Sequence, residues 1–197
     1  MQFFLKKVNK LNRGFTLVET LVAVSIFSMS ILALMSVLAG GISDIGYAKQ
    51  KMIATHLAQE GIEYIRNMRD TFVLYDASSQ VGWDAFNDKV APTPTTLCAS
   101  VNGCYLSDTN IDYSNHSQPM ALQMIVTACG SFCPEFLYDN ATGKYGIGSG
   151  SSSGFIPRIR VAIVSPNEIK VFSTISWTQG SGLHSVTFSE NLFNWVE

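Results

Sequence analysis

The sequence predicts an α+β fold in which a long N-terminal helix precedes an antiparallel β-sheet. Residues 15–43 form an apolar run that Glu19 and small hydroxyl residues interrupt. Residues 44–71 continue with an apolar stripe of helical spacing, whereas residues 158–196 alternate between apolar and polar with turns about every ten residues. Because the apolar side of each must be covered, we expect the helix to pack on one face of the sheet.

The apolar run is long enough to cross a membrane. Residues 20–43 contain no charge, and as a helix they would extend roughly 36 Å. A secretory signal peptide has a shorter apolar core. Residues 1–14 form a basic leader with no acidic residue, and its cations are Lys6, Lys7, Lys10 and Arg13. The positive-inside rule therefore predicts a cytoplasmic N-terminus and an exported remainder.

Glu19 does not suit a simple membrane anchor. Its carboxylate lies near the start of the apolar run, and a carboxylate within a membrane helix costs about 3 kcal/mol unless it has a partner. The run also begins abruptly after Gly14. A signal anchor with an isolated glutamate is the alternative, and this cost disfavours it.

The stretch Gly14-Phe15-Thr16-Leu17-Val18-Glu19 resembles the cleavage motif of prepilin peptidase, and residues 8 to about 70 resemble type IV pilin-like proteins. The resemblance implies the type IV pilin fold, cleavage between Gly14 and Phe15, and N-methylation of Phe15. It also implies that Glu19 pairs with the Phe15 ammonium group of a neighbouring subunit during assembly. A buried pair of this kind would fix the axial stagger of neighbouring helices.

The second half of the helix is expected to be amphipathic over residues 44–71. Gly40-Gly41 precedes it, and because glycine weakens a helix by roughly 1 kcal/mol relative to alanine, we expect a flexible point there. The predicted core stripe has spacings of three and four, and consists of Ile45, Ala48, Met52, Ile53, Leu57, Gly61, Ile65 and Met68.

Residues 58–70 resemble a run found in minor pilins of the PilV type and in one minor pseudopilin of type II secretion. This resemblance favours a low-copy subunit. The charged members of the run are Glu60, Glu63, Arg66 and Arg69. Their spacing is equally typical of ion pairs on a solvated helix face.

Residues 72–197 are predicted to form an exported, loop-rich β-sheet head. We expect a loop at 91–96, held down by Trp83 and Phe86, and a hairpin over 136–145 with a five-residue turn at 139–143. The meander over 158–196 should bury alternate side chains: Ile159, Val161, Ile163, Ile169, Val171, Ile175, Trp177, His184, Val186 and Phe188.

The four cysteines all lie in the head: Cys98, Cys104, Cys129 and Cys133. Their gaps do not match the two-residue gap that zinc ribbons favour. Export favours oxidation to two disulfides. We expect the local pairs Cys98–Cys104 and Cys129–Cys133, while the sequence leaves the other two connectivities open.

Asp108, Asn110 and Asp112 resemble the first ligands of a calcium loop. The glycine and glutamate that such a loop needs are replaced by Tyr113 and Pro119. A polar turn is therefore favoured over a calcium site.

No catalytic set is found in the sequence. His56, His116 and His184 fall in three different contexts, and no hydrolase, metalloprotease or phosphate-loop motif occurs. We therefore expect neither an enzyme nor a cofactor. The formal net charge is −2. The leader holds four of the 13 basic residues and none of the 15 acidic ones, so the remainder is mildly acidic and its direct binding to nucleic acid is not expected.

The favoured function is a structural minor pilin that initiates or caps a type IV pilus. A type II secretion pseudopilin and a membrane-anchored binding domain that never polymerises are the alternatives. The resemblance implies as partners other major and minor pilins, prepilin peptidase, the inner-membrane assembly platform and, before assembly, the lipid bilayer. It implies a single-pass protein of the bacterial inner membrane, with its head outside the cytoplasm, that then enters a pilus or pseudopilus.

Overall fold

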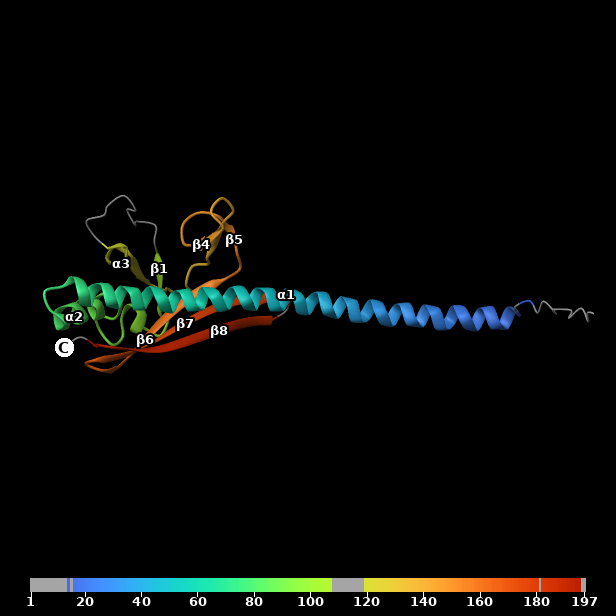
Figure 1. Cartoon of the computed structure of the whole chain (residues 1–197), viewed down its shortest axis with the longest axis horizontal. Coiled ribbons are helices and arrows are strands. Elements are labelled where there is room, and N and C mark those ends of the chain that lie inside the picture. The colour runs from blue at the N-terminus through green and yellow to red at the C-terminus, as the bar shows by residue number, and fades with distance from the viewer. Residues whose placement is uncertain (1–13, 15, 108–118, 181, 196–197) are drawn as a thin grey trace, which may run out of the picture. The chain divides into compact units, whose positions relative to one another are not determined.

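The computed structural model describes residues 14, 16–107, 119–180 and 182–195 (Figure 1). It divides at Gly46–Tyr47 into two compact units, which are described separately. The helical elements are α1 (Leu17–Tyr75), α2 (Ser79–Val90), the 3-10 turn η1 (Leu97–Ala99) and α3 (Met120–Gln123). The strands are β1 (Cys104–Ser107), β2 (Ile125–Ala128), β3 (Leu137–Asp139), β4 (Lys144–Gly146), β5 (Ser151–Ser152), β6 (Ile156–Ser165), β7 (Glu168–Gln179) and β8 (Gly182–Phe193).

The first unit holds the apolar part of α1. Gly40 and Gly41 both lie inside the helix, and a Cβ added at either position would meet no atom within 4 Å. The glycine pair therefore does not interrupt α1, because the backbone hydrogen bonds of a helix do not need a side chain. Our expectation of a flexible point is not matched by a break in this structure.

The predicted meander is confirmed in the second unit. Within the described residues, five strands form one antiparallel sheet in the order β2-β1-β6-β7-β8. The inward side chains of β7 are almost fully buried, and they include Ile169, Val171, Ile175 and Trp177. The expectation that Ile163 is buried was wrong, because it is 48% exposed near the end of β6, although it pairs with the buried Ile169.

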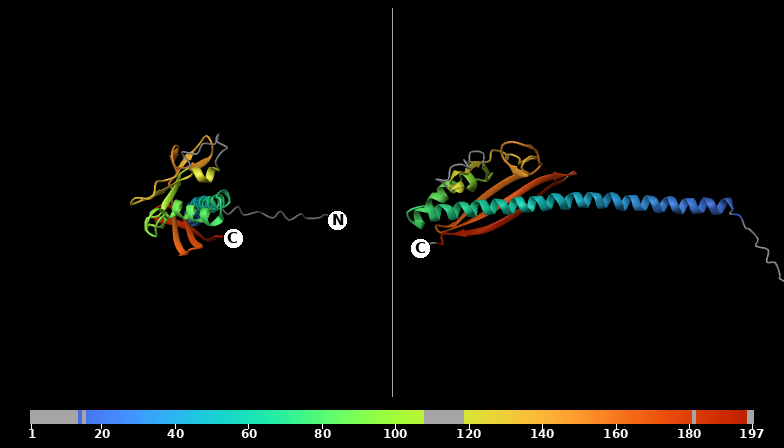
Figure 2. Two further views of the ribbon diagram at one scale, coloured as in Figure 1. Left: turned by 90° about the vertical axis from the view of Figure 1, so that its left-hand side faces the viewer. Right: turned by 45° about the horizontal axis from the view of Figure 1, so that its top comes forward.

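The C-terminal part of α1 covers one face of β6, β7 and β8 (Figure 2). The expected core residues Leu57, Ile65 and Met68 are buried there, as are Ala54, Ala58, Ile62 and Val73. Ile45, Ala48 and Met52 were wrongly placed in the core, because the buried face of α1 begins only at about Ile53. The α+β prediction, a long helix and a C-terminal antiparallel sheet, is confirmed, and it is consistent with the type IV pilin fold.

The 58–70 run joins α1 to the sheet. Ala58 is fully buried, and Gly61 lies so close to β7 that a Cβ there would overlap the Ser173 Oγ atom. Arg66 donates from Nε to Glu190 Oε1 of β8 at 3.2 Å, and this pairing is the main cause that raises the pKa of Arg66. Arg66 also pairs with Glu63 along the helix, so part of the run is the solvated ion pair that spacing alone predicted.

Helix α2 was not expected. Trp83, Phe86 and Val90 are fully buried on one side of it, and their spacing of three and four is the helical signal that the loop-like composition concealed. The Trp83 indole donates to Pro166 O at 2.7 Å. Gly82 allows α2 to touch the end of α1, since a Cβ there would overlap the Phe72 carbonyl.

The remaining head is held by two disulfides and a small second sheet. Cys98 is bonded to Cys104 and Cys129 to Cys133, which are the local pairs expected. The expected hairpin is present as β3 and β4, but Asp139 pairs with Lys144, so its loop is residues 140–143 rather than five residues. Strand β5 pairs with the other edge of β3.

Candidate functional site

The start of α1 is built by the residues that follow Gly14. Thr16 precedes the helix, and its Oγ1 accepts the Glu19 backbone N–H at 3.3 Å. The Thr16 carbonyl accepts the Thr20 N–H at 3.1 Å. A threonine followed three residues later by glutamate is a capping-box pattern. The sequence therefore contains a signal for a helix start at Thr16, which our prediction did not include.

Glu19 therefore occupies the third position of the helix, where it is the acidic residue of the first turn. A negative charge here interacts favourably with the helix dipole, by about 0.3–1 kcal/mol. Its side chain is exposed in the isolated chain. The geometry thus presents a carboxylate from the first turn of a helix that immediately follows the Gly14 segment.

The rest of this part of α1 presents apolar side chains on all sides. Large side chains between Leu17 and Leu38 are mostly more than half exposed, for example Leu17 at 79% and Val37 at 76%. The best window has a mean hydropathy of 2.4, and by length and composition this helix could cross a membrane. A helix that is apolar all round belongs in a bilayer or in the core of an assembly.

Three hydroxyl groups within the run donate to carbonyl oxygens of the helix itself. Thr20 Oγ1 donates to Leu17 O at 2.8 Å, Ser30 Oγ donates to Ile26 O at 2.8 Å, and Ser25 Oγ donates to Leu21 O. These residues can therefore enter an apolar environment without leaving an unsatisfied donor. Glu19 is the charged residue of the run, and in an apolar environment its carboxylate would need a partner from outside the helix.

In a comparison with known families, residues 9–35 match the prokaryotic N-terminal methylation motif. The chain carries the methylation motif of type IV pilin-like proteins. No curated protein and no solved structure matches the chain. The match spans Gly14, Phe15 and Glu19 together with most of the apolar run, so the motif and the exposed helix belong to one segment.

This motif supports a type IV pilin or pseudopilin type of protein, and it implies processing by prepilin peptidase and assembly with other pilins. The motif and the single long apolar helix also fit a membrane-anchored pilin. Proteins with this motif are structural rather than enzymatic in character. The PilV-type resemblance concerns residues 58–70, which lie outside the matched residues 9–35.

Several expected sites lie outside the described residues. They are most of the leader, Phe15, and the calcium candidates Asp108, Asn110 and Asp112. Within the ranges that the structure does describe, no group of three or more His, Cys, Asp or Glu side chains is placed to hold a metal ion. His56 lies on α1 and His184 on β8, as their sequence contexts suggested.

Proposed function

We propose that this chain is a minor pilin that initiates or caps a type IV pilus. Prepilin peptidase would cut between Gly14 and Phe15, Phe15 would be N-methylated, and the helix that follows would enter the filament core. The observation that carries the proposal is the exposed, all-apolar start of α1 with one carboxylate, Glu19, in its first turn.

Filament assembly would account for both features at once. Each fully buried Leu, Val or Ile contributes about 1.5–3 kcal/mol relative to exposure, so neighbouring helices gain by packing together. A carboxylate buried in the same contact needs a cation. The ammonium group of Phe15 in a neighbouring subunit would supply that cation, and because only one axial offset brings the two groups together, the pair would set the stagger.

The 58–70 run favours a minor subunit over a major one. It resembles the corresponding run of PilV-type minor pilins, and in this chain it joins α1 to the sheet through Gly61 and Arg66. The same run is shared with one minor pseudopilin of type II secretion, so a pseudopilin is the second candidate. Recovery of the chain in filaments sheared from the cell surface would favour the pilus. Retention in the envelope, together with a secretion defect on deletion, would favour the pseudopilus.

Glu19→Gln tests the assembly role, because glutamine keeps the shape of the side chain and removes its charge. The matched control is Asp44→Asn, which removes the next acidic charge along the chain, beyond the uncharged run. We expect Glu19→Gln to lower the amount of chain in sheared filaments at least tenfold, as roughly 1.4 kcal/mol or more of pairing would require. Leader removal should continue, and Asp44→Asn should assemble like the wild type.

A membrane-anchored binding domain that never polymerises gives a different result. It would be absent from sheared filaments whatever stands at position 19, and its leader would remain attached. Equal assembly of the wild type and Glu19→Gln would show that the assigned role of Glu19 is wrong.

A further inference from the structure

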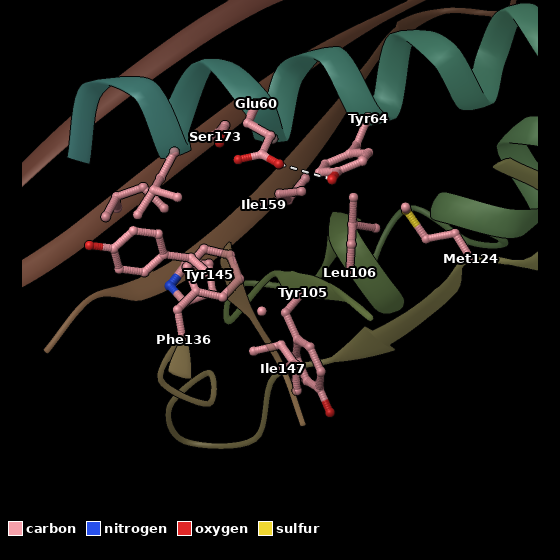
Figure 3. A pocket seen from close by; sticks show the side chains of 15 residues that line it. Glu60, Tyr64, Tyr105, Leu106, Met124, Phe136, Tyr145, Ile147, Ile159 and Ser173 are labelled. Atoms are coloured by element: carbon pink, nitrogen blue, oxygen red, sulfur yellow. Dashed lines mark hydrogen bonds between the residues drawn. The ribbon is translucent and has the colours of Figure 1, made fainter. Parts of the chain in front are cut away.

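A small pocket opens in the head between α1, β1, the β3–β4 hairpin and the β6–β7 pair, with a volume of about 50 Å³ (Figure 3). A cavity needs about 10–15 Å³ of such volume to hold one water molecule. The pocket thus has room for a few waters or for a short aliphatic group. All the residues that line it belong to the second unit, residues 47–197, and none comes from the N-terminal segment.

The walls of the pocket are aromatic and aliphatic. Figure 3 shows Tyr64 entering from α1, while Phe136, Tyr145 and Tyr105 approach from the opposite side. Burial is the main cause that raises the pKa of Tyr145, with Tyr138 adding to it, so the Tyr145 phenol stays neutral at physiological pH. Neutral aromatic rings carry negative charge on their faces, and these faces attract cations.

Glu60 is the charged residue among those that line this pocket. Its Oε1 accepts the Tyr64 hydroxyl at 2.9 Å (Figure 3), which directs the carboxylate along the pocket side of α1. In the part of the chain that the structure describes, the ion pairs are Arg66 with Glu63 and Glu190, and Arg69 with Asp70, so Glu60 has no cation of its own there. The pocket therefore combines aromatic faces and an apolar interior with one unneutralised negative charge.

The close approach of α1 to the sheet shapes this site. Gly61 and Ser173 both line the pocket, and a Cβ at Gly61 would overlap Ser173 Oγ. Because Gly61 has no side chain, α1 can lie close to Ser173 of β7 at this wall of the pocket. The glycine that permits this helix–sheet packing thus forms part of the pocket wall beside Glu60.

We propose that this pocket binds a primary alkylammonium group carried on a short apolar chain. The chain would occupy the apolar interior, and the ammonium group would pair with Glu60 beside the aromatic faces. A lysine side chain of a partner protein and a free monoamine share this chemistry. Ligand binding at this site would be an activity separate from filament assembly, because the pocket lies in the second unit and can be tested on the unassembled chain.

The experiment titrates the full chain in non-ionic detergent micelles with n-butylammonium, using ¹³C-methyl methionine signals as the readout. Met124 lines the pocket, whereas Met68 is buried elsewhere in the core and serves as the internal control. The probes n-butanol and n-butyrate have the same apolar chain with neutral and negative ends. Nα-acetyl-lysine amide, tested beside n-butylammonium, distinguishes a protein-borne lysine from a free amine.

We expect a saturable shift of the Met124 signal with n-butylammonium and an affinity about tenfold above that for n-butanol, the range that a cation on aromatic faces beside a carboxylate supplies. n-Butyrate should leave the signal unchanged. Glu60→Gln should weaken n-butylammonium binding about threefold to fivefold. The matched variant Glu63→Gln removes a charge one helical turn away that does not line this pocket, and it should have no effect.

Three results would each overturn the proposal: no Met124 shift, equal binding of n-butanol and n-butylammonium, or equal effects of Glu60→Gln and Glu63→Gln. An unchanged Met68 signal in each variant shows that the core is intact, so a lost response cannot be ascribed to unfolding. Failure of this site would leave the role of Glu19 untouched, because the two lie in different units of the chain.

Discussion

The backbone N–H of Glu19 donates to the Thr16 Oγ1 atom at 3.3 Å, so the residue that caps α1 and the carboxylate in its first turn are parts of one local structure. The helix begins at Leu17, directly after this cap. A hydrogen bond and helix geometry thus place Glu19 in the first turn of α1 before any neighbouring subunit is present.

Thr16→Val should weaken the start of α1. Valine keeps the branched shape of threonine but removes the acceptor, and loss of such a cap costs about 1 kcal/mol. Amide hydrogen exchange at Glu19, measured in micelles, should accordingly be about fivefold faster. Thr16→Ser keeps the acceptor and should exchange like the wild type. Unchanged exchange in Thr16→Val would show that the cap does not hold the helix start.

Gly82→Ala should destabilise the head by about 2 kcal/mol or more, because the new methyl group would overlap the Phe72 carbonyl and the Val73 Cα atom of α1. Both are backbone atoms that cannot rotate away. The measurement is chemical denaturation of the detergent-solubilised chain, followed by tryptophan fluorescence.

Gly130→Ala is the matched control for Gly82→Ala. A Cβ at Gly130 meets no atom within 4 Å, so its effect should stay within about 0.5 kcal/mol. Similar stabilities for the two variants would contradict the close packing of α2 on α1.

The two disulfides should differ in their contribution to stability. Cys98 and Cys104 are both fully buried in the main core, whereas Cys129 and Cys133 lie at its margin with 7% and 8% exposure. Replacement of either pair by alanine removes a short-loop constraint of about 2 kcal/mol. Replacement of Cys98 and Cys104 also removes fully buried sulfur atoms, so it should cost about 1 kcal/mol more. Equal unfolding free energies for the two double variants would be evidence against this difference.

Glu135 should stabilise the head in a pH-dependent way. Its Oε1 accepts the Ser152 hydroxyl and the Gly154 N–H, both at 2.6 Å, and these bonds lower the pKa of Glu135, the Ser152 bond most. Because the pKa is lower in the folded chain than in the unfolded chain, this contribution is fully present above the ordinary carboxyl pKa. It is lost as the pH falls through the lowered value.

The variant Glu135→Gln isolates that contribution. At pH 7 the wild type should be more stable by less than about 1 kcal/mol, because solvent reaches the carboxylate, and the difference should fade towards pH 3. Denaturation curves over this pH range give the comparison. A difference that stays constant with pH would mean that the charge of Glu135 is not what stabilises this loop.

Much of the fold could be predicted from sequence because its periodic signals are long. The apolar run, the stripe through Leu57, Ile65 and Met68, and the alternation in β7 each extend over several turns or strand positions. Ile163 keeps its register opposite Ile169, yet it is 48% exposed near the end of β6. Whether another element covers the end of a strand depends on tertiary packing and leaves no mark in the alternation itself.

Helix α2 and the pocket were missed for different reasons. The buried side chains of Trp83, Phe86 and Val90 had helical spacing, but polar residues around them are typical of a loop. The pocket brings together Glu60, Tyr105 and Phe136 from elements far apart in sequence, so no local pattern could reveal it. The methylation motif that contains Glu19 could be predicted from sequence, because its residues are adjacent in the chain and a carboxylate is unusual in a membrane segment.

The central claim, that this chain is a processed filament subunit of the type IV pilin-like kind, is tested most directly by the mass of its mature N-terminus. The chain would be purified from cells that express prepilin peptidase, and its N-terminal peptide analysed by mass spectrometry. The account predicts a peptide that begins with N-methylated Phe15 and lacks residues 1–14. An N-terminal peptide that still begins with Met1, in cells whose other prepilins are cut, would contradict it.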